Sequence, residues 1–207
     1  GQNNAMAGDV TGNKASMNAG SAARLIGGVV NGVGAAGKAS GNRAEVSNGS
    51  SAFIAGALVS DTGANGEVKD NHAVVSGANA PLGSIYGGIT NGAGTVTGNS
   101  ATVSGTGVSV NDVVGGQSVT GNAEGNKVEF TQATATNVRG ARIIGSGTGS
   151  AVNNEAKIAG GSVTGAAAAA EIQNAAATGN VKDNTLTVKG GTVSGDSYGG
   201  VTSGTGD

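Results

Sequence analysis

The residues best suited to acid–base chemistry are a lone histidine and a nearby carboxylate. His72 is the only histidine of the chain, Asp70 lies just before it, and serines are plentiful, so the side-chain types of a Ser/His/Asp triad are present. A triad is defined by the geometry of its three side chains and not by the presence of the residue types. His72 occupies a position that differs between the repeats described below, and a lone polar side chain at such a position is more often exposed to solvent. We therefore assign no catalytic residue. With no second histidine and no cysteine, the usual zinc ligands are also missing.

Carboxylates are candidates for two other kinds of site. Glu45 and Glu129 occupy equivalent places in the repeat described below, three units apart, which is about 14 Å at β-strand spacing. Paired glycosidase carboxyls lie only about 5–9.5 Å apart. Aspartates near turns are candidate calcium ligands: Asp61, Asp70, Asp183, Asp196 and Asp207. Calcium-binding solenoids repeat a Gly-Gly-x-Gly-x-Asp motif, which this chain lacks, so we interpret these aspartates as turn caps and expect no metal or cofactor.

The strongest pattern in the chain is a repeat of 27–30 residues. An asparagine is followed by alternating residues, of which the second and the fourth are apolar. The repeats begin at Asn13, Asn42, Asn71, Asn99, Asn126, Asn154 and Asn184. Because side chains alternate between the two faces of a β-strand, each repeat predicts one strand with a buried face. The fourth residue after each asparagine is expected in the core: Met17, Val46, Val75, Val103, Phe130, Ile158 and Val188.

Two further short runs complete each repeat. An apolar pair comes next and usually ends in a glycine pair, as in Ile85-Tyr86-Gly87-Gly88, and a small apolar residue such as Val68 stands three places before the next asparagine. Three short strands joined by turns predict one coil of a three-sided solenoid. We therefore expect an all-β fold, a single-stranded β-solenoid (β-helix) with about seven coils of 27–30 residues, forming one repetitive domain over residues 1–207. The glycines are assigned to turns that need a positive φ.

Stacking of the coils should place the repeat asparagines above one another. Coils stack about 4.8 Å apart, so seven coils give a rod of about 34 Å. A single coil cannot bury its inward face, whereas a stack buries a continuous core. The aligned asparagines are predicted to form an internal ladder, in which side-chain amides hydrogen bond along the axis as in other cross-β stacks.

One segment, residues 166–177, departs from the repeat. It consists of five alanines, then Glu171-Ile172-Gln173-Asn174, then three more alanines. Alanine is the best helix former, so one interpretation is a short helix or protruding loop that contacts a partner. The other is a widened coil with an alanine-packed side, which we favour because an isolated helix this short is marginally stable.

Composition argues against several classes of partner. The formal net charge is −2 and the eleven basic residues are spread thinly, whereas a nucleic-acid binder should show a basic patch, so no nucleic acid is expected. No run of about 18 apolar residues is present, so no membrane insertion by this segment is expected. The chain has no cysteine, which fits bacterial surface proteins that cross a periplasm unfolded, and a long solenoid does not need disulfides.

The last repeat resembles a known family. It reads Asn184-Thr-Leu-Thr-Val-Lys-Gly-Gly-Thr-Val-Ser-Gly-Asp-Ser-Tyr-Gly-Gly200, and Ile85-Tyr-Gly-Gly88 shares its ending. This sequence looks like the Asn-Thr-Val-Thr-Ile-x-Gly-Gly-x-Val-x-Gly-x-x-Tyr-Gly-Gly repeats of β-solenoid passenger domains in bacterial autotransporter-type (type V secretion) adhesins. The resemblance implies a secreted or outer-membrane-anchored β-helix with an extended, adhesive role. It brings no catalytic residues.

These observations lead to one expected function and two alternatives. We expect a non-catalytic extracellular rod with a structural or adhesive role, a segment of a bacterial surface or secreted protein that contacts a host or bacterial surface ligand. The alternative is a self-assembling extracellular fibre subunit that stacks end to end through uncapped coils, because bare end strands invite association. The remote alternative is a polysaccharide-active β-helix enzyme, which requires clustered acid and base groups that the sequence does not show.

Overall fold

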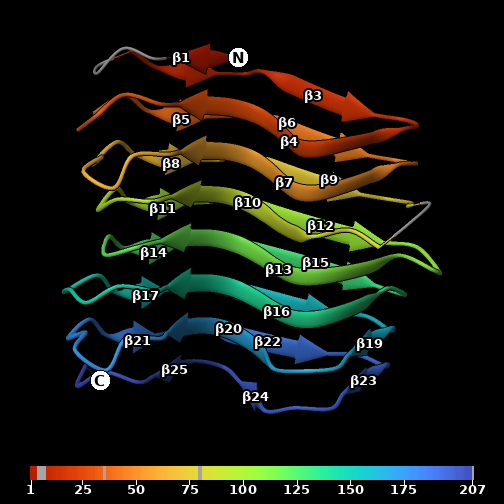
Figure 1. Cartoon of the computed structure of the whole chain (residues 1–207). Helices are drawn as coiled ribbons and strands as arrows, with labels where there is room; N and C mark the ends of the chain where they lie inside the picture. The colour runs from red at the N-terminus through yellow and green to blue at the C-terminus, as the bar shows by residue number, and fades with distance from the viewer. Residues whose placement is uncertain (4–7, 35, 79–80, 207) are drawn as a thin grey trace.

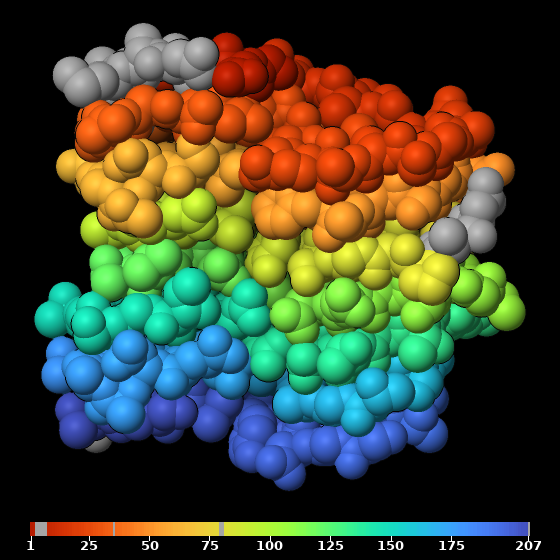
Figure 2. Space-filling model, viewed as in Figure 1, coloured from red at the N-terminus to blue at the C-terminus, as the bar shows by residue number. Residues whose placement is uncertain are grey.

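The protein folds as a stack of β-strand coils. The structure is a computed structural model that describes residues 1–3, 8–34, 36–78 and 81–206. These residues form strands and turns without a helix, and the coils make a β-solenoid of about seven turns (Figure 1). The coils are stacked in the order in which they occur in the sequence, as the colours of Figure 2 show. The predicted all-β solenoid fold is therefore confirmed.

Three parallel sheets, A, B and C, run along the stack. Sheet C contains the strands that follow the repeat asparagines. These are β3 (Lys14–Met17), β6 (Arg43–Val46), β9 (His72–Val75), β12 (Ser100–Ser104), β15 (Lys127–Thr131), β18 (Glu155–Ile158) and β22 (Thr185–Val188). Sheet B contains two-residue strands just before the asparagines. These are β2 (Val10–Thr11), β5 (Ala39–Ser40), β8 (Val68–Lys69), β11 (Val96–Thr97), β14 (Ala123–Glu124), β17 (Ala151–Val152) and β21 (Val181–Lys182).

Sheet A contains the longest strands and one extra layer. It begins with β1 (Gln2–Asn3), β4 (Ser21–Val30), β7 (Ser50–Val59), β10 (Ser84–Thr90), β13 (Ser109–Ser118) and β16 (Thr134–Ile143). In the following coils the strand is divided into shorter pieces. These are β19 (Ser162–Val163), β20 (Ala167–Ile172), β23 (Thr192–Val193), β24 (Ser197–Tyr198) and β25 (Val201–Thr202).

Equivalent residues of successive repeats lie in register, so the apolar positions form continuous columns. Ala44, for example, pairs with Ala15 on one side and with Ala73 on the other. Of the residues expected in the core, the first six are buried: Met17, Val46, Val75, Val103, Phe130 and Ile158. The seventh expectation is wrong, since Val188 is 44% exposed. It lies on β22, which is the edge strand of sheet C, so no further strand of this sheet covers it.

A glycine pair, or its equivalent, bends each long strand of sheet A in the middle. The pairs at Gly27-Gly28, Gly87-Gly88 and Gly115-Gly116 lie within strands and none has a positive φ, so their assignment to turns is wrong. A Cβ on Gly115 would lie 2.4 Å from the carbonyl oxygen of Gly140 and 2.6 Å from that of Lys127. Glycine is therefore required because the backbones of sheets A and C touch at the bend.

The bend divides the interior into two cores and leaves a concave outer face. Ile54 lies in one core and Val59 in the other. On the outer face, side chains from the two sides of the bend pack on each other, and Tyr86 and Val114 are buried although they point away from both cores. Figure 2 shows this face hollowed between the left and right halves of the coils.

The alanine-rich segment adopts the solenoid structure. Ala167–Ile172 forms strand β20, which pairs with β16. Ala167 lies in one core and Ala170 in the other, so small side chains line this coil on both sides of the bend. The interpretation as a helix is wrong, because tertiary packing within the stack outweighs the helix propensity of alanine.

Candidate functional site

The seven repeat asparagines form a continuous ladder along the axis. From Asn13 to Asn154, the backbone N–H and the side-chain Nδ2 of each asparagine both donate to Oδ1 of the next, over 2.8–3.1 Å. Nδ2 also donates to a carbonyl of the preceding coil, as from Asn99 to Val68 over 2.9 Å. An interior asparagine therefore uses both amide hydrogens and accepts two hydrogen bonds at Oδ1.

The ladder and the glycine pair depend on each other. Asn42, Asn71, Asn99 and Asn126 are fully buried, and a buried amide is stable only when it is hydrogen bonded. A Cβ on Gly116 would lie 2.3 Å from Oδ1 of Asn126, so the second glycine of the pair leaves the space that the amide occupies. The ladder is thus a structural site that holds successive coils in register, rather than a reactive one.

His72 meets a serine of the next coil, but the third member of a triad is not in place. Nδ1 of His72 lies 2.7 Å from Oγ of Ser100, on the outer face of sheet C. Among the described residues, no hydrogen bond joins Asp70 to His72, so nothing orients the ring as a triad carboxylate would. Burial, followed by the nearby Arg43 guanidinium, lowers the pKa of His72 below its ordinary value of 6.5. The neutral imidazole is the favoured form.

The candidate glutamate pair is separated by two intervening strands. Glu45 lies on β6 and Glu129 on β15, with β9 and β12 between them. Nζ of Lys14 lies 2.5 Å from Glu45, and Arg43 also pairs with this carboxylate. Hydrogen bonds from Lys14 and then Arg43 lower the pKa of Glu45. Glu45 is therefore part of an ion-pair row that links β6 to β3, and it lies apart from Glu129.

The candidate calcium ligands are dispersed over turns. Asp61 accepts hydrogen bonds from Gly63 N–H at 2.7 Å and from Gly34 N–H of the preceding coil at 3.1 Å, as a turn cap does. Asp70 and Asp183 have φ values of 53° and 55°, and Asp196 accepts a hydrogen bond from the hydroxyl of Tyr198. Asp207 lies outside the described residues. Within the described part of the chain, no group of three or more His, Asp or Glu side chains could hold a metal ion.

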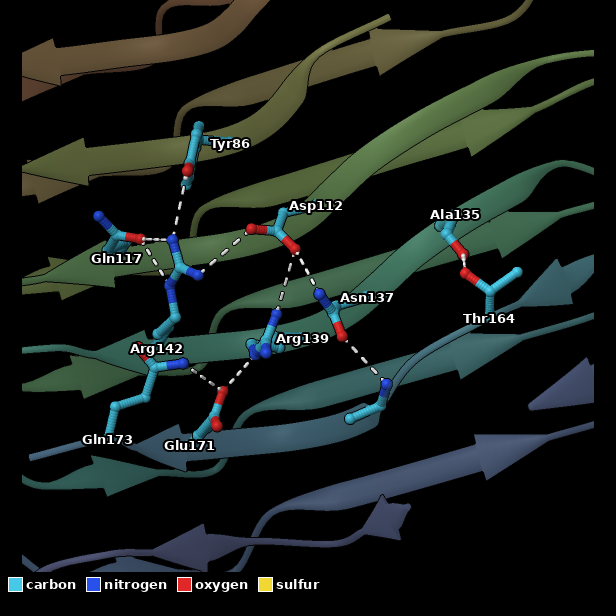
Figure 3. A network of polar contacts seen from close by, with 11 residues as sticks. Tyr86, Asp112, Gln117, Ala135, Asn137, Arg139, Arg142, Thr164, Glu171 and Gln173 are labelled. Atoms are coloured by element: carbon cyan, nitrogen blue, oxygen red, sulfur yellow. Dashed lines mark hydrogen bonds and ion pairs between the residues drawn. The ribbon is translucent and has the colours of Figure 1, made fainter. Parts of the chain in front are cut away.

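A polar network on the concave face of sheet A was not expected from the sequence. It joins β10, β13, β16 and β20, with two arginines at its centre (Figure 3). Arg139 pairs with Asp112 at 3.4 Å and with Glu171. Arg142 pairs with Asp112 at 3.4 Å, donates from Nε to Gln117 at 2.7 Å, and donates from Nη2 to the hydroxyl of Tyr86 at 3.3 Å.

The network is internally neutral and mostly shielded from solvent. Its two arginines face two carboxylates, so their formal charges cancel, and the arginine side chains are 9% and 13% exposed. Arg139 stacks between Val114 and Ala168, which are apolar. A repeat alignment places Arg139 where the adjacent coils have Val114 and Ala168, and this departure from an apolar position is the signal by which the network could have been found.

No protein-family model, curated protein or solved structure matches this chain. In the described residues, no helix is long and apolar enough to cross a membrane.

Proposed function

We propose that this chain is a non-catalytic rod with a structural or adhesive role in a bacterial surface or secreted protein. The observation that carries the proposal is the asparagine ladder, which runs without interruption from Asn13 to Asn184. Such a ladder fixes the spacing and the register of the coils, which is what a rod requires.

Ion pairs between adjacent coils support the same role. Lys38 pairs with Glu67, and Lys127 pairs with Glu155, in each case across neighbouring coils. These exposed pairs each contribute at most about 1 kcal/mol. Together with the network around Arg139, they connect coils at the surface as the ladder does in the interior. The resemblance of the repeats to autotransporter-type adhesins supports a location outside the cell or on the outer membrane.

Deletion of one repeat tests the proposal. Residues 42–70 run from one ladder asparagine to the residue before the next, so their removal should bring Asn13 into hydrogen-bonding register with Asn71. A modular rod is expected to stay folded and to shorten by one coil, about 4.8 Å. Circular dichroism and small-angle X-ray scattering measure these two properties. A matched deletion of residues 50–78 also removes 29 residues, but it begins in a different part of the coil, and it should also fold. Deletion of residues 42–55 removes only part of a coil and should not fold.

A second function, self-assembly into fibres, is favoured by the polarity of the ladder. At one end, Oδ1 of Asn13 accepts no hydrogen bond from another described residue, and at the other end the backbone N–H of Asn184 has no such acceptor. An acceptor at one end and a donor at the other are complementary. Val188 and Tyr198 add exposed apolar surface at the donor end.

Negative-stain electron microscopy over a range of concentrations separates the two functions. Filaments that lengthen with concentration would support end-to-end assembly. Single short particles at every concentration would contradict it and leave the rod proposal unchanged.

A further inference from the structure

The turns that lead from sheet A to sheet B differ in length along the stack. They span residues 60–67 after β7 and 144–150 after β16, but only 91–95 after β10 and 119–122 after β13. In Figure 1 the loop before β14 projects less than the loop before β17. The short turns therefore leave a notch on this edge of the solenoid, which we define by its lining residues: Ala93, Thr95, Thr120, Gly121, Asn122, Ser146, Gly147, Thr148 and Gly149.

Two buried hydroxyls build the short turns. At the end of the sheet A strands, other coils place Val59 or Ile143 in the core, whereas these two coils carry Thr90 and Ser118, both fully buried. Oγ1 of Thr90 accepts from Gly92 N–H at 3.2 Å. Oγ of Ser118 accepts from Gly121 N–H, in the turn that directly follows it, at 2.9 Å. It donates to the carbonyl oxygen of Gly94, in the turn of the preceding coil, at 2.9 Å. The two hydroxyl residues therefore determine the short turns, and their hydrogen bonds hold the backbone beside the notch in place.

The lining of the notch is polar and carries no charge. Its cavity measures about 530 Å³, within the range of about 300–1,000 Å³ that small-molecule sites occupy. None of the lining side chains is titratable or aromatic. Among the described residues, no hydrogen bond involves the hydroxyls of Thr95, Thr120 and Thr148. The side chain of Asn122 uses only Oδ1, which accepts from Ser150 N–H.

We propose that the notch binds an uncharged saccharide unit. Hydroxyl groups both donate and accept hydrogen bonds, so a lining of hydroxyls and one amide matches a ligand made of hydroxyls. A charged ligand would lose hydration on entering the notch, and none of the lining residues carries a charge that could compensate for this loss. The proposal rests on the adhesive role proposed above, because it names the class of ligand that the rod would hold.

The test is a glycan array probed with the labelled chain, followed by NMR titration of the ¹⁵N-labelled chain with lactose, maltotriose and diacetylchitobiose. Binding in the notch should shift the backbone amide signals of Thr120, Gly121 and Gly147. Thr120→Val and Thr148→Val remove one hydroxyl each and keep the side-chain shape, so each should weaken binding about three- to tenfold. Ala93→Phe fills the notch from its exposed rim and should abolish binding.

A matched control variant, together with a check that the bound sugar stays intact, makes the result decisive. Thr102→Val removes a hydroxyl from the outer face of β12, away from the notch, and should leave binding unchanged. No binding to the array and no shifts with the three sugars would overturn the saccharide proposal, as would shifts confined to other surfaces. Neither result affects the rod, which the repeat deletion tests separately. Cleavage of a bound sugar would instead overturn the non-catalytic function while the site itself stands.

Discussion

At the scale of single residues, the interior asparagines are used to their full hydrogen-bonding capacity. Asn99 donates to Asn126 and to Val68, and it accepts from both the backbone and the side chain of Asn71. Loss of its amide would leave partners on both sides without a hydrogen bond in a dry interior. Asn13 is only half-buried and, within the described chain, accepts no such bonds.

Asn99→Ala is therefore expected to destabilise the fold far more than Asn13→Ala. Each buried group left unpaired costs about 1–3 kcal/mol, so Asn99→Ala should lower the free energy of unfolding by about 3 kcal/mol or more. Asn13→Ala should cost about 1 kcal/mol. Urea denaturation followed by circular dichroism measures both values. Equal losses would show that the ladder does not stabilise the interior as its geometry indicates.

His72 gives the fold a dependence on pH. Because burial lowers its pKa in the folded state, the unfolded chain binds more protons, so stability falls as pH drops below about 6.5 and through the lowered folded value. His72→Gln removes this group and should flatten the melting temperature between about pH 7 and pH 5.5. Thermal scans of both proteins across that range make the comparison. A slope that persists in the variant would assign the pH dependence to other groups; Glu45 titrates below this window.

At the scale of elements, the glycine pair determines the shape of sheet A. Gly115→Ala would place a Cβ 2.4 Å from a neighbouring carbonyl oxygen, whereas a Cβ on Gly199, the equivalent residue of the last coil, meets only the carbonyl oxygen of Asn184 at 3.4 Å. Neither glycine has a positive φ, so the comparison isolates packing from backbone strain. Gly115→Ala should cost about 3 kcal/mol and Gly199→Ala should be nearly neutral. Denaturant titration tests this, and similar costs would contradict close contact of the sheets at the bend.

The polar network should hold its four strands more strongly than exposed ion pairs do. Arg139→Met keeps much of the side-chain volume but leaves Asp112 and Glu171 without their shared cation, at a cost of about 3–5 kcal/mol. Lys127→Met breaks an exposed pair and should cost less than about 1 kcal/mol. Melting temperatures of the two variants are the measurement. An Arg139→Met protein as stable as the parent would mean that the network adds no net stability, as happens when desolvation offsets ion pairing.

The sequence predicts the elements better than it predicts their tertiary contacts. Alternation after each asparagine identifies the strands of sheet C, and even spacing identifies the coil, because both follow from local periodicity. The bend at Gly115-Gly116 depends on the approach of two sheets, which no local pattern contains. The network around Arg139 and the notch at Thr120 depend on differences between repeats. The repeat pattern is defined by what the repeats share, so it does not contain these differences.

At the scale of the whole molecule, strand pairing joins each coil only to its immediate neighbours, so stability should vary along the stack. Interior coils are covered on both sides, whereas β22 is an edge strand with Val188 exposed. In a linear array of this kind, units at the ends open at a lower free energy than units in the middle.

Native-state hydrogen exchange should therefore be slowest in the middle and faster toward the ends. The N–H groups of Asn71 and Asn99 are buried and donate to the next ladder oxygen, so their exchange should require opening of the stack itself. Amides of β23 to β25 lie in the outermost coil and should exchange by local fraying. Mass spectrometry or NMR resolves this gradient. Uniform protection over all coils would instead show that the solenoid opens only as one cooperative unit, in which coupling between neighbours exceeds the fraying energy of an end coil.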